Sequence, residues 1–139
     1  MVPSDTQGAI RDTIRAFAQE KLAPRSLAFE RERGYPEGLF EEMGELGLVG
    51  MIAPAEYGGA AAEFTAYILG LVEIAAADGA LSTIVSIQNS MMVEGALAFG
   101  SDHHNARYLS AYTRFTKERP TSSAWSSPER CDGPTSRYE

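Results

Sequence analysis

Apolar side chains recur every three or four residues over most of positions 1–112, which is the period of a helix that buries one face. The repeat predicts a first helix that Ser4 or Asp5 caps. Its apolar face consists of Ile10, Ile14, Phe17, Ala18 and Leu22. Pro24 fits the first turn of a continuing helix over residues 24–32, and Pro36 opens another. The apolar face of that helix consists of Leu39, Phe40, Met43 and Leu46.

Three further helices are predicted downstream. Apolar positions repeat over residues 62–77, and Asp78-Gly79 then interrupts the pattern. Residues 80–99 are apolar nearly all round, which predicts a central, buried helix. Gly100 ends this helix, and Ser101 can cap a last one. An alternating strand pattern is absent, except for a few residues near positions 49–53.

The segment "ELGLVGMIAPAEYGG", residues 45–59, is both apolar and rich in glycine. Such a segment suits neither a mobile linker nor a regular helix. Gly47 can end the preceding helix, and we expect residues 48–53 to run extended with buried side chains. Pro54 prevents a helix from resuming, and the residues Tyr57-Gly58-Gly59 form the turn before the next helix.

Composition changes sharply near position 110. Residues 110–139 contain no Leu, Ile, Val or Met, but six Ser, four Thr and three Pro. A segment without aliphatic side chains buries too little surface to offset the entropy lost on ordering. We therefore predict one helical domain over residues 1–112 and a low-complexity tail over 113–139, which is either disordered or the product of a shifted reading frame.

Charge and cysteine content exclude several classes of protein. The net charge is −7, and residues 1–109 hold 15 acids against seven bases. Clustered cations are needed to bind nucleic acids or anionic membranes, so neither partner is expected. The single cysteine, Cys131, rules out an internal disulfide, and the first residues lack a signal-peptide pattern. These features favour a cytoplasmic protein.

Residues that could carry chemistry are few. His103 and His104 are adjacent, so on a helix they point about 100° apart and do not form a two-ligand metal site. Cys131 stands in the tail, without the cationic surroundings that make a thiolate reactive. Glu94 is either a buried acid or an exposed residue near a helix end. No catalytic and no metal-binding residue is predicted.

Asn89 and Ser90 are polar residues within the most apolar predicted helix. Burying an unpaired amide or hydroxyl costs on the order of 1–3 kcal/mol, so each needs a partner. Two interpretations stay open at this point. Either they bond to a neighbouring loop, or the helix lies beside a ligand cavity, which the adjacent Met91 and Met92 would also suit.

Three segments, taken in order, resemble the N-terminal helical domain of the flavin-dependent acyl-CoA dehydrogenases. They are "EMGELGLVGMIAPAEYGG", "VEIAAADGALSTIVSIQNSMM" and "FGSDHHNARYL", and the upstream "FAQEKLAP" is similar as well. The resemblance covers roughly residues 6–109. It implies an all-α, orthogonal bundle of about five or six helices, followed here by an irregular C-terminal tail.

The resemblance also implies a function. Members of this family oxidise an acyl-CoA thioester to the 2,3-enoyl-CoA with FAD and pass the electrons to an electron-transfer flavoprotein. By resemblance, the helix at 80–99 flanks the acyl tail. The residues implied to contact the tail are Thr83, Ile84, Ile87 and Met91.

The tail departs from the family pattern. A Leu-Thr-Glu-Pro stretch, and then the flavin-contacting and catalytic domains, follow in the family, whereas "SAYTRFTKERPTSSAWSSPERCDGPTSRYE" ends this chain. We therefore expect a truncated, inactive form that binds no FAD alone. The alternative is a small helical interaction module derived from such a domain. In either case an exposed apolar face would favour self-association.

Overall fold

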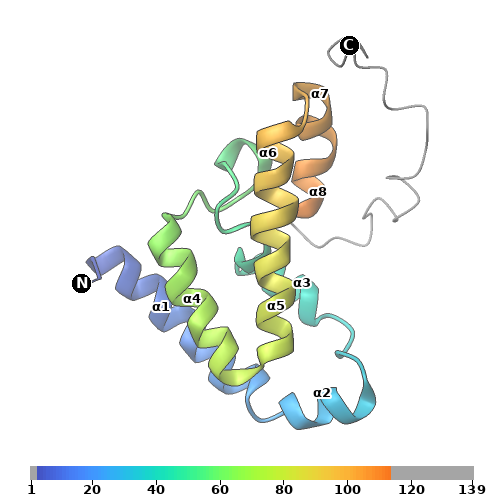
Figure 1. Ribbon diagram of the computed structural model, residues 1–139. Helices are drawn as coiled ribbons and strands as arrows, with labels where there is room; N and C mark the ends of the chain where they lie inside the picture. The colour runs from blue at the N-terminus through green and yellow to red at the C-terminus, as the bar shows by residue number, and fades with distance from the viewer. Residues whose placement is uncertain (1–2, 114–139) are drawn as a thin grey trace, which may run out of the picture.

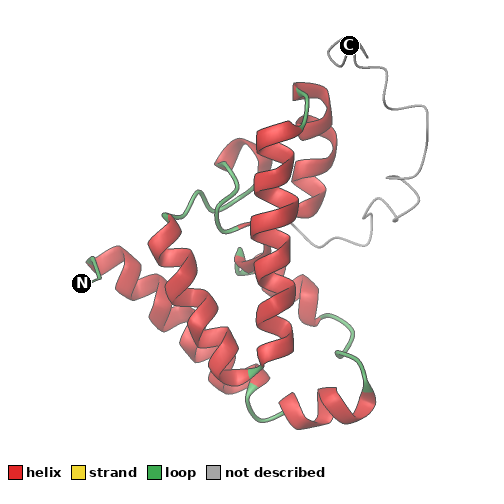
Figure 2. Ribbon diagram, in the orientation of Figure 1, coloured by secondary structure: helices red, strands yellow, loops and turns green. Residues whose placement is uncertain are grey.

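The computed structural model describes residues 3–113, and all regular elements in that range are helical (Figures 1 and 2). Six helical rods are present there, as the sequence predicted. The first three are α1 (Asp5–Phe17), which continues through a π-helical turn (Ala18–Leu22), α2 (Ser26–Glu32) and α3 (Leu39–Glu45). Two 3-10 turns follow, at Leu48–Gly50 and Ala55–Tyr57, and then α4 (Phe64–Ala77). The next rod consists of α5 (Gly79–Ile87), a π-helical segment (Gln88–Glu94) and α6 (Gly95–Phe99). The last rod consists of α7 (Asp102–His104), a π-helical segment (Asn105–Leu109) and α8 (Ser110–Tyr112).

The long rod from α5 to α6 is the centre of the arrangement. At its lower end it meets α4, which in turn lies along α1, and α7–α8 folds back against its upper end (Figure 1). The core consists of two hydrophobic clusters, one toward each end of this rod. The larger joins α1–α5 through residues such as Ile14, Met43 and Val85, and the smaller joins Val93 to Leu109.

Two predicted helix caps are confirmed. Ser4 forms a capping box with Gln7, in which the Gln7 N–H donates to Ser4 Oγ at 3.3 Å and the Ser4 N–H donates to Gln7 Oε1 at 3.0 Å. Ser101 Oγ accepts from the His104 N–H at 3.2 Å and starts α7. Asp5, the alternative cap, is the first residue of α1 instead.

The predicted break at Asp78-Gly79 is the buried junction of three elements. The Asp78 carboxylate accepts from the Leu81 N–H at 2.8 Å, which caps α5, and from Ser26 Oγ at 2.8 Å, which fastens α2. The Tyr35 hydroxyl donates to the same carboxylate at 3.4 Å. Burial, and then the Asp78 charge, raises the pKa of Tyr35.

One prediction about the glycine-rich segment is wrong. Residues 48–53 are not extended, because Leu48–Gly50 forms a 3-10 turn and residues 51–53 bend. Their burial is as predicted, with Val49 and Ala53 fully inaccessible to solvent. Groups outside the turn bond to its backbone. The Ala60 N–H donates to the Gly50 carbonyl at 2.9 Å, and Asn89 Nδ2 donates to the Leu48 carbonyl at 2.9 Å.

The predicted tail lies almost wholly outside the described residues. Its first residue, Thr113, is buried and packs on Gly50, and its hydroxyl donates to the Tyr57 carbonyl at 2.9 Å. Across residues 3–113, no helix combines the length and the hydropathy needed to cross a membrane.

Candidate functional site

The four residues that the resemblance implied lie together on one side of the central rod. Thr83, Ile84 and Ile87 belong to α5, and Met91 follows in the π-helical segment. We call them the α5 face. Thr83 is exposed, Ile84 is half-buried against the larger core cluster, and Ile87 and Met91 are 45% and 68% exposed. The helix is central, as predicted, but its burial is incomplete, because Ile87 and Met91 are exposed.

The α5 face is electrically neutral. No charged residue occurs between Gly79 and Val93, and the Thr83 hydroxyl already donates to the Gly79 carbonyl at 3.1 Å. Glu94, the next charged residue, is exposed, in agreement with the second of its two predicted positions. A face without charge and without free hydrogen-bonding groups suits contact with hydrocarbon rather than with a polar ligand.

Asn89 lies on the opposite side of the same rod. Its side chain is fully buried, and Nδ2 donates to the carbonyls of Leu48 at 2.9 Å and of Val85 at 3.0 Å. Its Oδ1 accepts from the Ile52 N–H at 3.4 Å. Ser90 Oγ donates to the Ser86 carbonyl at 2.7 Å within the rod. The loop-bonding interpretation is thus confirmed for Asn89, which joins the rod to the glycine-rich segment.

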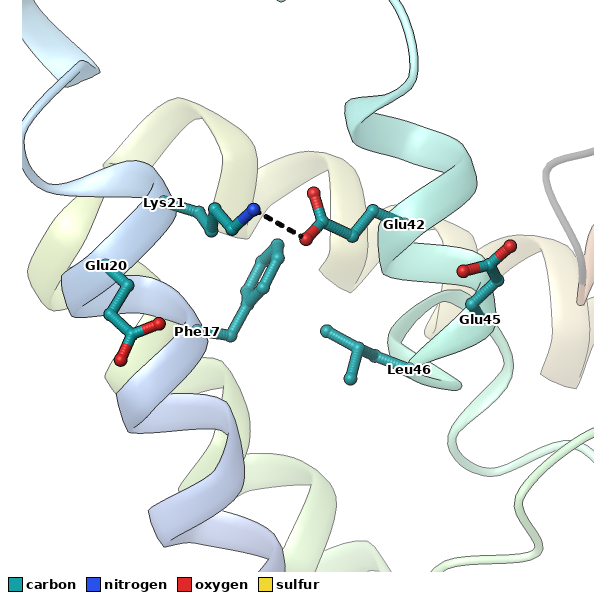
Figure 3. A pocket seen from close by; sticks show the side chains of 6 residues that line it. All are labelled: Phe17, Glu20, Lys21, Glu42, Glu45 and Leu46. Carbon is teal, nitrogen blue, oxygen red and sulfur yellow. Dashed lines mark ion pairs between the residues drawn. The ribbon is translucent and has the colours of Figure 1, made fainter.

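A second feature was not predicted from the sequence. A pocket of about 400 Å³ opens between the end of the first rod and α3 (Figure 3). The residues lining it are Phe17, Glu20, Lys21, Glu42, Glu45 and Leu46. Phe17 is buried and Leu46 is 44% exposed, so an apolar surface lies inside a charged border. We call it the Phe17 pocket.

The border of the Phe17 pocket is negative overall. Lys21 Nζ pairs with Glu42 Oε1 at 3.1 Å across its mouth, which leaves two carboxylates, Glu20 and Glu45, without an ion pair in the described part of the chain (Figure 3). Sequence reasoning missed the pocket because its two halves are more than 20 positions apart and only packing brings them together. A partial signal existed, since Phe17 and Leu46 both belong to predicted apolar faces.

The remaining candidates from the sequence are His103, His104 and Cys131. The His104 ring packs on the Tyr108 ring, with 4.7 Å between the centroids, and His103 is exposed. Within that range no three His, Cys, Asp or Glu side chains gather as metal ligands. Cys131 lies outside the described residues.

Comparison with known proteins identifies the relatives of this helical arrangement. The family model of the acyl-CoA dehydrogenase N-terminal domain matches residues 4–116. The chain belongs to the acyl-CoA dehydrogenase family. It is 34% identical over 113 residues to the mitochondrial short-chain specific acyl-CoA dehydrogenase of Mus musculus. That match takes in 81% of this chain but 27% of the relative, so the chain spans about a quarter of the curated relatives' length.

Several solved structures share the fold. A glutaryl-CoA dehydrogenase from Mycobacterium smegmatis superposes with a TM-score of 0.76 at 33% identity, over 81% of this chain and 29% of that one. A complex of a glutaryl-CoA dehydrogenase from the same organism with FADH2 gives a TM-score of 0.75 at 26% identity, over 81% and 29% of the two chains. A structure described as an electron transferring flavoprotein of Acidaminococcus fermentans gives 0.73 at 25% identity, over 82% and 30%.

Several groups in residues 3–113 that could hold the diphosphate of FAD already have partners. Proteins hold a diphosphate with backbone N–H groups at a helix N-terminus or with Arg and Lys side chains. The N-terminus of α5 is already satisfied by the Asp78 carboxylate, which would repel a phosphate. Five of the described cations have partners: Arg11 with Asp12, Arg15 with Glu73, Lys21 with Glu42, Arg25 on the Phe29 ring and Arg107 on the Tyr108 ring.

Proposed function

We propose that this chain supplies the α-helical surface against which the acyl tail of an acyl-CoA thioester lies in an acyl-CoA dehydrogenase. The observation that carries the proposal is the exposed, neutral α5 face, which Asn89 fixes in place from behind. A hydrocarbon tail gains most from an apolar surface that is already ordered before it binds. Ile87 and Met91 offer most of that surface.

We further propose that the chain by itself does not catalyse the oxidation to the 2,3-enoyl-CoA. The reaction needs a base for the α-proton and a flavin that accepts the β-hydride. The α5 face carries no carboxylate, and most of the cations in residues 3–113 already have partners. Both groups would come from residues outside this range or from another chain.

The absence of independent activity is tested on the purified chain. After the chain has been incubated with excess FAD and desalted, we expect no flavin absorbance in the protein fraction. We also expect no dye reduction with butyryl-CoA, octanoyl-CoA or glutaryl-CoA. Flavin retained near one equivalent, together with turnover, would show that this chain is an enzyme on its own.

The role of the α5 face is tested separately in a chimera. Residues 4–112 replace the matching domain of the Mus musculus short-chain enzyme, and kcat/KM is measured against acyl chain length. Met91→Trp should fill the space at the face and lower kcat/KM about tenfold or more for the longest accepted chains, with little effect on the shortest. Val72→Trp on α4, outside the α5 face, is the matched control. Equal profiles for both variants would remove Met91 from the acyl site.

The Phe17 pocket favours a second function, the docking of a protein partner. A side chain that anchors a protein interface usually enters an apolar recess with polar or charged side chains around it. We propose that an electron-transfer flavoprotein inserts an apolar side chain over Phe17 and Leu46, with basic residues beside Glu20 and Glu45. If the chain is instead a small helical interaction module, its partner would bind in the same pocket. The two interpretations therefore differ in the partner and not in the binding site.

Docking at the Phe17 pocket is tested by calorimetric titration of the chain with an electron-transfer flavoprotein. Leu46→Glu should weaken binding about tenfold or more, and added salt should weaken the unmodified complex. Leu27→Glu, on α2 and also exposed, is the matched control. Binding that Leu46→Glu leaves unchanged would exclude the pocket. Absence of binding would favour a different partner for the module.

A further inference from the structure

The four methionines among the described residues differ sharply in their exposure to solvent. Met43 and Met51 lie in the larger core cluster and are 0% and 4% exposed, and Met92 is half-buried against the smaller cluster. Met91 is 68% exposed, which is more than ten times the exposed fraction of Met51. The thioether of Met91 is therefore the most accessible of the four to small molecules dissolved in water.

Met91 lies on the side of the central rod that faces solvent. Ile87, about one turn earlier, is 45% exposed, and Glu94, about one turn later, is exposed as well. The side of the rod that holds Asn89 and Val93 faces the interior, where both residues are fully buried. Water therefore reaches the Met91 side chain and can relay protons there, whereas Met43 and Met51 become accessible only when the fold opens.

A hydroperoxide oxidises a thioether in one two-electron step. A lone pair of the sulfur attacks one oxygen of hydrogen peroxide, and the O–O bond breaks. Water relays the proton of the transferred oxygen to the departing hydroxide, which becomes a second molecule of water. The sulfur is oxidised to the sulfoxide and the peroxide is reduced. Because the peroxide must reach the sulfur, the order of exposure predicts the order of oxidation.

Oxidation of Met91 would change the α5 face from apolar to polar. The sulfoxide oxygen is a hydrogen-bond acceptor, and the hydroxyl on this face is already engaged, because Thr83 donates to the Gly79 carbonyl. A hydrocarbon tail on the face would displace the water bound to the sulfoxide without replacing its hydrogen bond, and this loss opposes binding. The core is spared, since Met43 and Met51 are buried.

We propose that Met91 is a site of reversible oxidation by hydroperoxides, and that its sulfoxide weakens the contact between the α5 face and an acyl tail. Methionine sulfoxide reductases restore the thioether, so the change is reversible. The order of oxidation follows from exposure alone. The effect on the acyl tail rests on the proposed function of the α5 face, so the two parts are tested on different proteins.

The order of oxidation is tested on the 139-residue chain by timed exposure to hydrogen peroxide and peptide mapping by mass spectrometry. In the folded chain Met91 should be oxidised at least about tenfold faster than Met43 and Met51, because exposure governs susceptibility. In concentrated urea the three rates should become similar, since unfolding exposes every methionine. Equal rates in the folded chain, or oxidation of Met43 or Met51 before Met91, would overturn the proposal.

The effect on the acyl tail is tested in the chimera that carries residues 4–112, with and without Met91→Leu. Leucine is apolar but cannot be oxidised, so oxidation elsewhere in the chimera affects both forms equally. After peroxide treatment, kcat/KM for the longest accepted acyl chain should fall at least about threefold further in the Met91 form. Reductase treatment should remove this difference. Met91→Gln, which is polar and of similar length, should lower the same kcat/KM without peroxide.

Two results in the chimera would overturn the effect on the acyl tail, and they have different meanings. If Met91→Trp changes the chain-length profile but peroxide lowers kcat/KM equally with and without Met91→Leu, the proposed function holds and the sulfoxide has no influence. If neither Met91→Trp nor peroxide distinguishes the forms, the acyl tail does not contact Met91, and the proposed function fails together with the sulfoxide effect.

Discussion

At the level of single residues, Gly59 has very little room for a side chain. A methyl group added at Gly59 would collide with the carbonyl carbon, the carbonyl oxygen and the Cβ of Ala53. Backbone atoms of a buried turn cannot move aside as the end of a flexible side chain can. The preceding Gly58 has a φ of 81°, so the pair provides both a left-handed backbone and a close approach.

Gly59→Ala should therefore lower the free energy of unfolding by about 3 kcal/mol, the upper part of the range for overpacked sites. Gly8→Ala is the control. Gly8 lies inside α1 with nothing within 4 Å of an added Cβ, and this change should raise stability by about 0.5–1 kcal/mol. Urea unfolding followed by circular dichroism measures both. Similar effects of the two substitutions would contradict the close contact with Ala53.

At the level of elements, Asn89 determines how the central rod and the glycine-rich segment fit together. Asn89→Ala leaves the Leu48 carbonyl without its bond to the rod and creates a cavity, so we expect a loss of about 2–4 kcal/mol. Ser90→Ala, which removes a local bond to Ser86, should change stability by less than about 0.5 kcal/mol. Faster hydrogen exchange at residues 48–53 in Asn89→Ala, but not in Ser90→Ala, would identify the broken connection.

The same elements show how far the sequence could predict this fold and its site. The rod at residues 79–99 followed from an apolar repeat bounded by Asp78 and Gly100, because these signals are local. The turn at residues 48–53 did not, because its backbone bonds to Asn89, which is 41 positions from Leu48, and to Ala60, which lies beyond the next turn. A strand and a buried turn share the same short apolar run, and only these partners distinguish them.

The sequence likewise predicted only part of the candidate site. The family resemblance implied Thr83, Ile84, Ile87 and Met91, and their helical spacing is that of residues on one side of a helix. Spacing could not tell which side faces water, because residues 80–99 are apolar nearly all round. For the Phe17 pocket the sequence held only the partial signal of Phe17 and Leu46 on two apolar faces, since the pocket exists only after the first rod and α3 have packed. Local periodicity thus determines the elements, while exposure depends on their assembly.

At the level of the whole molecule, one ion pair links the first rod to α4. Arg15 binds Glu73 through two nitrogens, and Glu73 is largely shielded from solvent, with 16% of its side chain exposed. The hydrogen bond from Arg15, followed by its charge, lowers the pKa of Glu73 in the folded chain. The pKa of an unfolded glutamate is about 4.3. The pair therefore stabilises the fold fully above that pH and loses its effect as the pH falls through the lower, folded pKa.

Glu73→Gln should consequently lower the melting temperature at pH 7, and the difference from the unmodified chain should shrink progressively as the pH falls below about 4.3. The glutamine cannot be protonated in this range, so its own interaction with Arg15 stays constant while that of the carboxylate disappears. Glu56→Gln changes the net charge equally at an exposed position outside the α1–α4 contact, and it controls for that change.

Melting curves from pH 7 to pH 3 compare the three proteins. A difference that stays constant with pH would mean that the α1–α4 contact does not depend on the charge of Glu73. A shrinking difference would assign part of the acid sensitivity of the bundle to this pair.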